Sequence, residues 1–186
     1  MGPVQFCESA NVQASRRAFF GASRAGSVHP IRPPWAIAED DFVEICTRCA
    51  ACIEACPTGL LVKGGGGFPE ADFTPGRAPE GCTFCGKCLE SCRDWALLRQ
   101  PDEAPWALKA VFSEACLAAQ KVVCRTCGEA CEAGAIRFPP RLGGVSLPQL
   151  DAAACTGCGA CLADCPTTAI RIRPDSSRSI AQQGAA

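Results

Sequence analysis

Side chains for acid–base catalysis are scarce in this sequence. The chain has one histidine and no tyrosine, and it shows neither a Ser/His/Asp arrangement nor a glycine-rich phosphate-binding loop. The single histidine, His29, lies between Val28 and Pro30, a context that favours an exposed loop residue over a general base. We therefore do not expect an enzyme with an acid–base site, and we expect no catalytic residues.

Long apolar runs and a strong charge imbalance are also absent. No run of about 18 apolar residues occurs, so no transmembrane helix is expected. A net charge of −1 gives no electrostatic reason to expect a nucleic-acid partner. Leu, Ile, Val and Phe together make up about a fifth of the chain, which is near the lower limit for a stable core. Something besides side-chain burial must therefore hold the fold together.

Cysteine, in contrast, is abundant, with 17 among 186 residues. Such a density is typical of small scaffolds that are stapled by disulfides or metals. An odd count argues against complete disulfide pairing. The recurring C-x2-C spacing places two thiols poorly for a bond to each other but well for surrounding one metal centre. The cysteines therefore favour metal binding over disulfides.

Three cysteine runs share one spacing, C-x2-C-x2-C-x3-C. They are CTRCAACIEACP from Cys46, CTFCGKCLESCR from Cys82 and CTGCGACLADCP from Cys155. This is the bacterial ferredoxin run that ligates [4Fe–4S] clusters. Four-cysteine zinc sites usually show two pairs separated by a spacer, so the spacing favours iron–sulfur clusters over structural zinc.

A further unit, the third along the chain, is stretched. It has the spacing C-x7-C-x2-C-x3-C and runs from Cys116 to Cys131. The closing cysteines of the other units are Cys56, Cys92 and Cys165, so the four closing positions follow at nearly constant intervals. The stretched unit therefore belongs to the same repeat, and we predict a fourth cluster there. A vacant or three-iron site is the alternative.

The predicted cluster ligands are the sixteen cysteines of these four units: Cys46, Cys49, Cys52, Cys56, Cys82, Cys85, Cys88, Cys92, Cys116, Cys124, Cys127, Cys131, Cys155, Cys158, Cys161 and Cys165. In two-cluster ferredoxins the fourth cysteine of such a run ligates the other cluster. The spacing leaves open whether that happens here. The remaining cysteine, Cys7, is expected to be a free thiol.

The segments between the cysteine runs predict a loop-rich α+β fold with short β-hairpins and one-turn helices. Residues 60–73 and 135–151 each read as a strand, a glycine-containing turn and a second strand. Residues 106–112 alternate in polarity and predict a strand that enters the third unit. Residues 41–46 are the candidate for the corresponding strand before the first unit.

This pattern predicts tandem ferredoxin-like two-cluster modules. We expect the first at residues 41–99 and the second at 100–173, joined within the proline-rich RQPDEAPW. An N-terminal tail at 1–40 and a flexible C-terminal tail at 174–186 would flank them.

The N-terminal tail contains ASRRAFF, which is similar to the twin-arginine motif of exported bacterial proteins. Such a signal also needs a continuous apolar stretch and a cleavage site, but arginines and prolines soon follow the motif. We therefore predict that the tail is not a cleaved signal and that the protein stays in the cytoplasm. Arg16, Arg17 and Phe19 are candidates for binding a partner, with solvated surface charge as the alternative for the two arginines.

Several stretches occur together in a fixed order: SRRAFF, IRPPWA, CTRCAACIEAC, GGGGFPEADF, the stretched unit EACLAAQKVVCRTCGEACEAGAIRF, and PQLDAAACTGCGACLADCP. In this combination the chain, over residues 12–172, resembles the NapF family of ferredoxin-type proteins. One departure is Arg93 after Cys92, where ferredoxins favour proline. The resemblance implies a cytoplasmic accessory of the periplasmic nitrate reductase system. It also implies a partner, the catalytic subunit NapA, which carries an iron–sulfur cluster and a molybdenum cofactor.

Three functions remain open at this point. The first is an accessory protein that binds the NapA precursor before export and assists its iron–sulfur maturation or redox state. The second is a general ferredoxin-type electron-transfer module that feeds a nitrate reductase or a related redox chain. The third is a structural adaptor whose clusters only stabilise the fold. The long arginine-bearing tail favours the first, because a simple ferredoxin needs no such segment.

Overall fold

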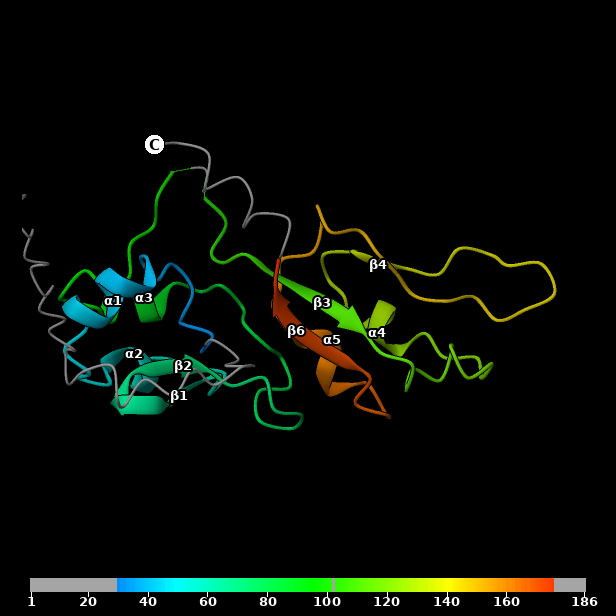
Figure 1. The fold of residues 1–186 in the computed structure, drawn as a ribbon, viewed down its shortest axis with the longest axis horizontal. Coiled ribbons are helices and arrows are strands. Elements are labelled where there is room, and N and C mark those ends of the chain that lie inside the picture. The colour runs from blue at the N-terminus through cyan, green and yellow to red at the C-terminus, as the bar shows by residue number, and fades with distance from the viewer. Residues whose placement is uncertain (1–29, 102, 176–186) are drawn as a thin grey trace, which may run out of the picture.

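The computed structural model describes residues 30–101 and 103–175 of the chain. Secondary structure in this part is sparse, with short helices and strands joined by long loops (Figure 1). Two hydrophobic cores are present, one formed by residues between 35 and 97 and one by residues between 108 and 172. We call the two parts the N-terminal lobe (30–101) and the C-terminal lobe (103–175). The loop-rich α+β fold expected from the sequence is confirmed.

The N-terminal lobe begins with helix α1, Glu39–Ile45. The strand predicted at residues 41–46 is therefore wrong. Acidic side chains fill the first turn of α1, where they interact favourably with the positive end of the helix dipole. Phe42 is fully buried from this helix, whereas Val43 is 40% exposed. Phe42 is the buried residue of this segment, and one buried residue on one face is typical of a short surface helix rather than of a strand.

A hairpin follows in the same lobe, as the sequence predicts. Strand β1, Leu61–Lys63, pairs antiparallel with β2, Pro69–Ala71, with Leu61 opposite Ala71. The short 3-10 helix η2, Gly65–Gly67, forms the turn, and Gly66 has a φ of 65° there. Glycine adopts this left-handed conformation without steric penalty. The four consecutive glycines thus explain the tight reversal.

The C-terminal lobe is built on a longer strand pair. Strand β3, Leu108–Phe112, pairs antiparallel with β6, Ile170–Pro174, along all five residues. Strand β4, Ile136–Arg137, pairs with β5, Gln149–Leu150. The predicted strand at 106–112 and the predicted hairpin at 135–151 are both confirmed. The pairing of β3 with β6, which lies far along the chain, was not predicted from the sequence.

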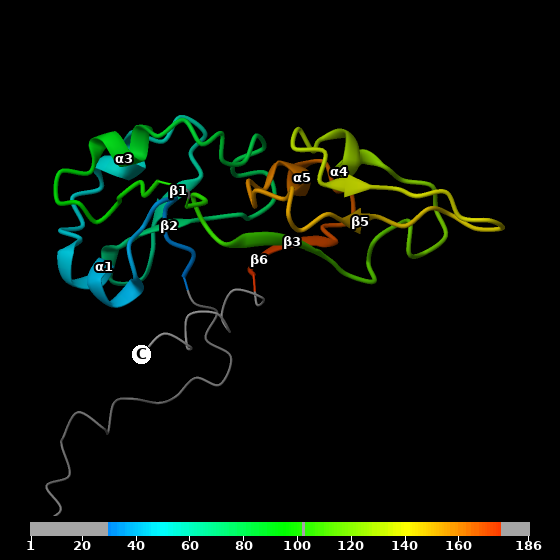
Figure 2. The same ribbon diagram turned by 90° about the horizontal axis from the view of Figure 1, so that it is seen from above.

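Each cysteine unit carries one short helix, and the helices pack in pairs, α2 on α3 and α4 on α5. Figure 2 shows the two lobes side by side, with α3 in one and α4 and α5 in the other. The four helices are α2, Ala51–Glu54; α3, Lys87–Ser91; α4, Thr126–Glu129; and α5, Ala160–Ala163. The predicted one-turn helices are therefore present, and each bears the third cysteine of its unit.

The structure does not test several of the sequence-based predictions. Cys7, Arg16, Arg17, Phe19 and His29 lie outside the described residues. The module boundaries remain predictions. Within residues 30–101 and 103–175, the helices are all too short and too polar to cross a membrane.

Candidate iron–sulfur sites

Four cavities in the described residues are each lined by four cysteines. We number each site by the unit that supplies its first three cysteines. Site 1 is lined by Cys46, Cys49, Cys52 and Cys92; site 2 by Cys82, Cys85, Cys88 and Cys56; site 3 by Cys116, Cys124, Cys127 and Cys165; and site 4 by Cys155, Cys158, Cys161 and Cys131. The fold thus brings all sixteen predicted ligands into four sets. Their binding of iron remains a prediction.

The fourth cysteine of every unit lies in its neighbour's site. Cys56 closes site 2 and Cys92 closes site 1, and the same exchange occurs between sites 3 and 4 through Cys131 and Cys165. Packing of the paired helices places the two units of a lobe back to back. The geometry is the one in which the fourth cysteine of a ferredoxin run ligates the other cluster of a pair. The spacing alone left open which cluster the fourth cysteine would ligate, and the geometry favours the neighbouring one.

The dimensions of these sets suit a cluster better than a single ion. Across the described residues, no three Cys, His, Asp or Glu side chains are close enough together to hold one metal ion. The sixteen cysteines there are free rather than joined in disulfides. Four cysteine sulfurs that bind one zinc ion must each lie about 2.3 Å from the metal. A four-iron cluster holds its four thiolates farther apart, because each binds a different iron atom. The residues present therefore fit [4Fe–4S] clusters.

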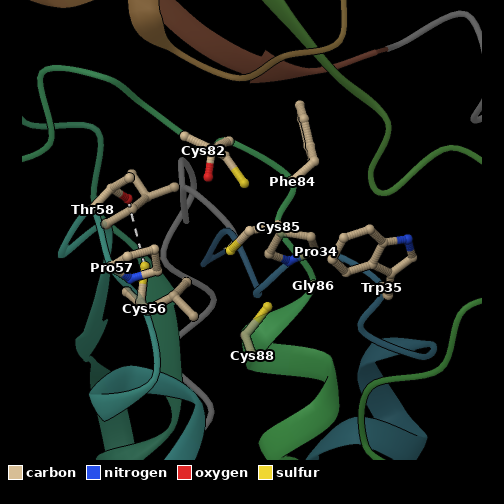
Figure 3. Close-up of a pocket in the computed structure, with 13 residues that line it drawn as sticks. Pro34, Trp35, Cys56, Pro57, Thr58, Cys82, Phe84, Cys85, Gly86 and Cys88 are labelled. Carbon is tan, nitrogen blue, oxygen red and sulfur yellow. Dashed lines mark hydrogen bonds between the residues drawn. The ribbon is translucent and has the colours of Figure 1, made fainter.

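Site 2 illustrates how the cysteines converge (Figure 3). Cys56 reaches the site from the first unit, and the other three cysteines lie along the loop and helix of the second unit. Pro34, Trp35 and Phe84 line the same cavity, and Trp35 is only 7% exposed. Apolar walls of this kind limit the access of water, which together with hydrogen bonds to sulfur sets the potential of a cluster.

Burial strongly affects the thiols. Removal from water is the main reason that the pKa of Cys52, Cys82 and Cys161 rises to about 12 and that of Cys88 and Cys127 to about 11. Neighbouring cysteines of the same set, and for Cys52 and Cys161 also one cysteine of the adjacent set, add to the effect. All four sites thus contain thiols that stay protonated at neutral pH without metal. Because ligation requires thiolates, metal binding must release these protons.

Cys56 behaves differently. Burial raises the pKa of its thiol, but backbone N–H groups of Leu61 and Leu60, together with the N–H and hydroxyl of Thr58, outweigh burial and lower the pKa overall. The hydroxyl oxygen of Thr58 lies 3.6 Å from the sulfur. Hydrogen bonds to a cluster sulfur are one of the levers on its potential.

A similar arrangement recurs at the end of the fourth unit. The N–H of Ala169 donates to the sulfur of Cys165 over 3.3 Å, and the hydroxyl of Thr167 lies 3.9 Å from the same atom. Cysteine, proline and threonine follow one another at the end of both the first and the fourth units. Sequence reasoning missed these threonines, although the repeated tripeptide was a signal for them.

The second unit replaces that proline with Arg93. Here the turn is held by the hydroxyl of Thr47, which donates to the carboxylate of Asp94 over 2.7 Å. Thr47 follows Cys46 directly, so this bond ties the loops of the first and second units together beside site 1. The departure from the ferredoxin pattern is thus accompanied by a side-chain contact between the units.

The stretched third unit still completes its set. The N–H of Gln120 donates to the carbonyl of Cys116 over 3.1 Å, and that of Val122 to the carbonyl of Leu117 over 2.9 Å. These bonds fold the inserted residues back on themselves. Cys116 therefore lies in the lining of site 3 together with Cys124, despite the long separation in sequence.

The regular units share a backbone feature that the stretched unit lacks. On both sides of the second cysteine, the residue has a positive φ, which curls the loop around its site. In the third unit the residue after that cysteine, Arg125, has a φ of −136°. The residues with positive φ are Arg48 and Ala50, Phe84 and Gly86, and Gly157 and Gly159.

Known proteins agree with this picture. The family described as a 4Fe-4S dicluster domain matches residues 45–94 and 122–178. The ferredoxin-type protein NapF of Haemophilus influenzae is 47% identical over 140 residues, which are 75% of this chain and 77% of that protein. NapF of Escherichia coli is 41% identical over 159 residues, 86% of this chain and 94% of that protein. The methylamine utilization ferredoxin-type protein MauM of Paracoccus denitrificans is 34% identical over 162 residues, 77% of this chain and 71% of that protein.

The repeated cysteine units, the loop-rich fold and the dicluster match define a ferredoxin-type iron–sulfur protein that binds [4Fe–4S] clusters. Among such proteins, the identity over most of both chains is decisive. The chain belongs to the NapF family.

Proposed function

We propose that this protein is a cytoplasmic accessory protein with four [4Fe–4S] clusters in two ferredoxin-like modules, residues 41–99 and 100–173. It binds the precursor of NapA, the catalytic subunit of periplasmic nitrate reductase, before export and assists its iron–sulfur maturation or redox state. The observation that carries the proposal is the crossed four-cysteine set, which occurs twice in each lobe. Kinship with the NapF proteins supports the choice of partner.

Bound clusters would supply one-electron redox chemistry. The chain itself holds the thiolates, stabilises their charge and limits water. Hydrogen bonds to Cys56 lower the pKa of its thiol and so favour the charged sulfur. Cys165 accepts a hydrogen bond from the N–H of Ala169, and Trp35 covers site 2 with apolar surface. Cys49 and Cys85 are the exposed ligands of sites 1 and 2, so a partner could approach these sites most closely there.

The N-terminal tail would contact the partner through Arg16, Arg17 and Phe19. Changing both arginines to Ala should weaken binding to the NapA precursor, most clearly at low ionic strength where charges are least screened. A matched control removes two exposed charges elsewhere, Lys121 and Arg141, and should bind normally. Equal binding by the two variants would remove the arginines from the docking site.

The function itself is tested on the reductase. NapA purified from cells that lack this protein should contain less iron and show a lower specific activity per molecule, because its cluster would be incompletely assembled or wrongly poised. The wild-type gene should restore both values. A fully metallated and fully active reductase from the deleted strain would rule out the maturation role.

A general electron-transfer module is the second candidate, and one observation favours it. Each site has a full set of four cysteines, which leaves no open position for handing iron to another protein. Under this alternative, the deleted strain would contain fully loaded NapA but would reduce nitrate more slowly. Iron content and cellular nitrate turnover, measured together, separate the two functions.

A further inference from the structure

The two lobes touch where a ligand of site 2 meets a ligand of site 4. The backbone N–H of Cys82 donates a hydrogen bond to the carbonyl of Cys158 over 2.8 Å. Cys82 belongs to the N-terminal lobe and Cys158 to the C-terminal lobe. A short run of covalent bonds and one hydrogen bond therefore joins the sulfur of one site to the sulfur of the other.

Glycine makes this approach possible. Gly81 precedes Cys82 with a φ of +63°, and a Cβ at this position would lie 2.3 Å from the carbonyl oxygen of Cys158 and 2.7 Å from the nitrogen of Ala160. Backbone atoms cannot yield as the end of a flexible side chain can. Any larger residue at position 81 would thus push the two cysteine loops apart.

An aromatic bridge closes the same junction. The indole N–H of Trp106 donates to the carbonyl of Thr156 over 3.0 Å, and Thr156 directly follows Cys155 of site 4. The Trp106 ring lies 5.8 Å from the ring of Phe84, which stands between two cysteines of site 2. It also lies 5.8 Å from the ring of Phe73. Trp106 therefore contacts residues of both cysteine loops that are joined by the Cys82–Cys158 backbone hydrogen bond.

We propose that this junction is the electron route between the lobes, so that the chain conducts as one series of sites in the order 1, 2, 4 and 3. The crossed cysteines connect the two sites inside each lobe, and the Cys82–Cys158 contact connects the lobes. The inference rests on the proposed function, because it requires clusters in all four sites.

The redox step balances with one electron and no proton. A one-electron donor, such as a reduced ferredoxin or dithionite, reduces one terminal site. At the junction, a cluster held by Cys56, Cys82, Cys85 and Cys88 would give up one electron, and a cluster held by Cys131, Cys155, Cys158 and Cys161 would accept it, or the reverse. A one-electron acceptor takes the electron from the other terminal site. Electron tunnelling falls steeply with distance and passes better through bonds than across gaps, so the rate should depend on the contact.

The test uses the full-length holoprotein and light-driven reduction with fewer than one electron per molecule. Redistribution among the sites is then followed by rapid freezing and electron paramagnetic resonance. Gly81→Ala should slow the concentration-independent redistribution between lobes at least tenfold. Gly143→Ala is the matched control, since Gly143 has a φ of +69° with no atom within 4 Å of its added Cβ. It should redistribute electrons like the wild type.

A second pair of variants tests the junction independently of whether Gly81→Ala folds correctly. Trp106→Leu removes the bond to Thr156 and both ring contacts, and it should slow redistribution several-fold. Trp95→Leu changes a tryptophan that is 68% exposed and should have no effect.

Iron is measured in every sample. If Gly81→Ala and Trp106→Leu keep the wild-type iron content and the wild-type rate of electron redistribution, the junction is not the electron route. The four-cluster proposal would still stand. Loss of iron from both variants would assign the contact to cluster retention and would also overturn the electron route. A wild-type protein that saturates below four clusters would instead contradict the proposed function.

Discussion

In the N-terminal lobe a helix, α1, leads into the first cysteine unit, whereas in the C-terminal lobe a strand, β3, leads into the stretched unit. The strand pairs with β6 along five residues, but the matching position in the N-terminal lobe shows only the isolated bridge between Ala36 and Leu97. The crossed cysteine arrangement is nevertheless the same in both lobes. The arrangement of the cysteines is therefore the same whether a helix or a strand leads into the first cysteine unit of the lobe.

The cores differ in the same way. The N-terminal core includes buried aromatic rings as well as leucines. The rings of Phe42 and Phe68 lie 6.2 Å apart, and the guanidinium of Arg32 lies 5.1 and 5.2 Å from their centroids. The buried residues of the C-terminal core are aliphatic residues, such as Leu108 and Ile172, and cysteines, and its aromatic rings are only partly buried. Each core is small, which suggests that neither lobe could keep its loops in place by burial alone. The cysteine sets shared between paired units would, with clusters bound, explain why such different cores can serve one arrangement.

Removal of iron should have the largest effect, because it should unfold both lobes and so remove the difference between them. Because each core is small, cluster binding should supply much of the folding free energy, as in other small metallodomains. The iron-free protein should be largely unfolded or molten. Residual hydrogen-exchange protection, if any, should lie in β3 and β6. Dispersed amide resonances and a cooperative melt of an iron-free sample would contradict this prediction.

Single ligand changes test whether the crossing holds in both lobes. Cys92→Ser should remove the cluster of site 1 and leave that of site 2, although Cys92 belongs to the second unit. In the other lobe, Cys116→Ser should empty site 3. Each change should lower the iron content by about four atoms per chain, and Cys7→Ser should leave it unchanged. Iron analysis and paramagnetic resonance of the reduced proteins provide the measurement.

An unaltered iron content in Cys116→Ser would remove the stretched unit from the cluster sites. A loss of the site 2 signal, rather than the site 1 signal, in Cys92→Ser would show that each unit keeps its own fourth cysteine.

A core change should weaken one lobe and spare the other. Phe42→Ala removes a fully buried ring that also lines site 1, a loss of about 3–5 kcal/mol in typical cores. We expect bleaching of the iron–sulfur absorbance at a lower temperature for half of the clusters only. Val43→Ala, at a 40% exposed position of the same helix, should change little. Equal loss from both lobes would show that the lobes do not unfold separately.

Much of this organisation could be predicted from sequence because the cysteine spacing is so restrictive. The four units, the hairpins at residues 60–73 and 135–151 and the strand at 106–112 were all evident. The helix at Glu39–Ile45 was not, since one buried Phe42 gives no periodicity and the acidic first turn was overlooked. The pairing of β3 with β6 joins segments far apart in the chain, and local patterns carry no information about such pairing.

The same reason explains what was missed in the sites. The exchange of fourth cysteines depends on how α2 packs on α3, which the spacing does not reveal. The hydrogen bond from Ala169 to Cys165 depends on the path of the chain after the site. The meeting of Cys82 with Cys158 depends on how the lobes join.

The smallest effect should come from the backbone of a single cysteine loop. Ala50 has a φ of 65° beside site 1, and a left-handed conformation is strained for any residue with a Cβ, by about 1 kcal/mol or more. Ala50→Gly should therefore raise the bleaching temperature slightly, although added freedom in the unfolded chain offsets part of the gain. Ala51→Gly is the matched control, because Ala51 begins helix α2, where glycine costs about 0.5–1 kcal/mol. The two neighbouring substitutions should thus shift the bleaching temperature in opposite directions. In the third unit, where Arg125 has a negative φ, Arg125→Gly has no strain to relieve and should not stabilise site 3. A stabilising Arg125→Gly, or a destabilising Ala50→Gly, would show that loop strain does not distinguish the regular units from the stretched one.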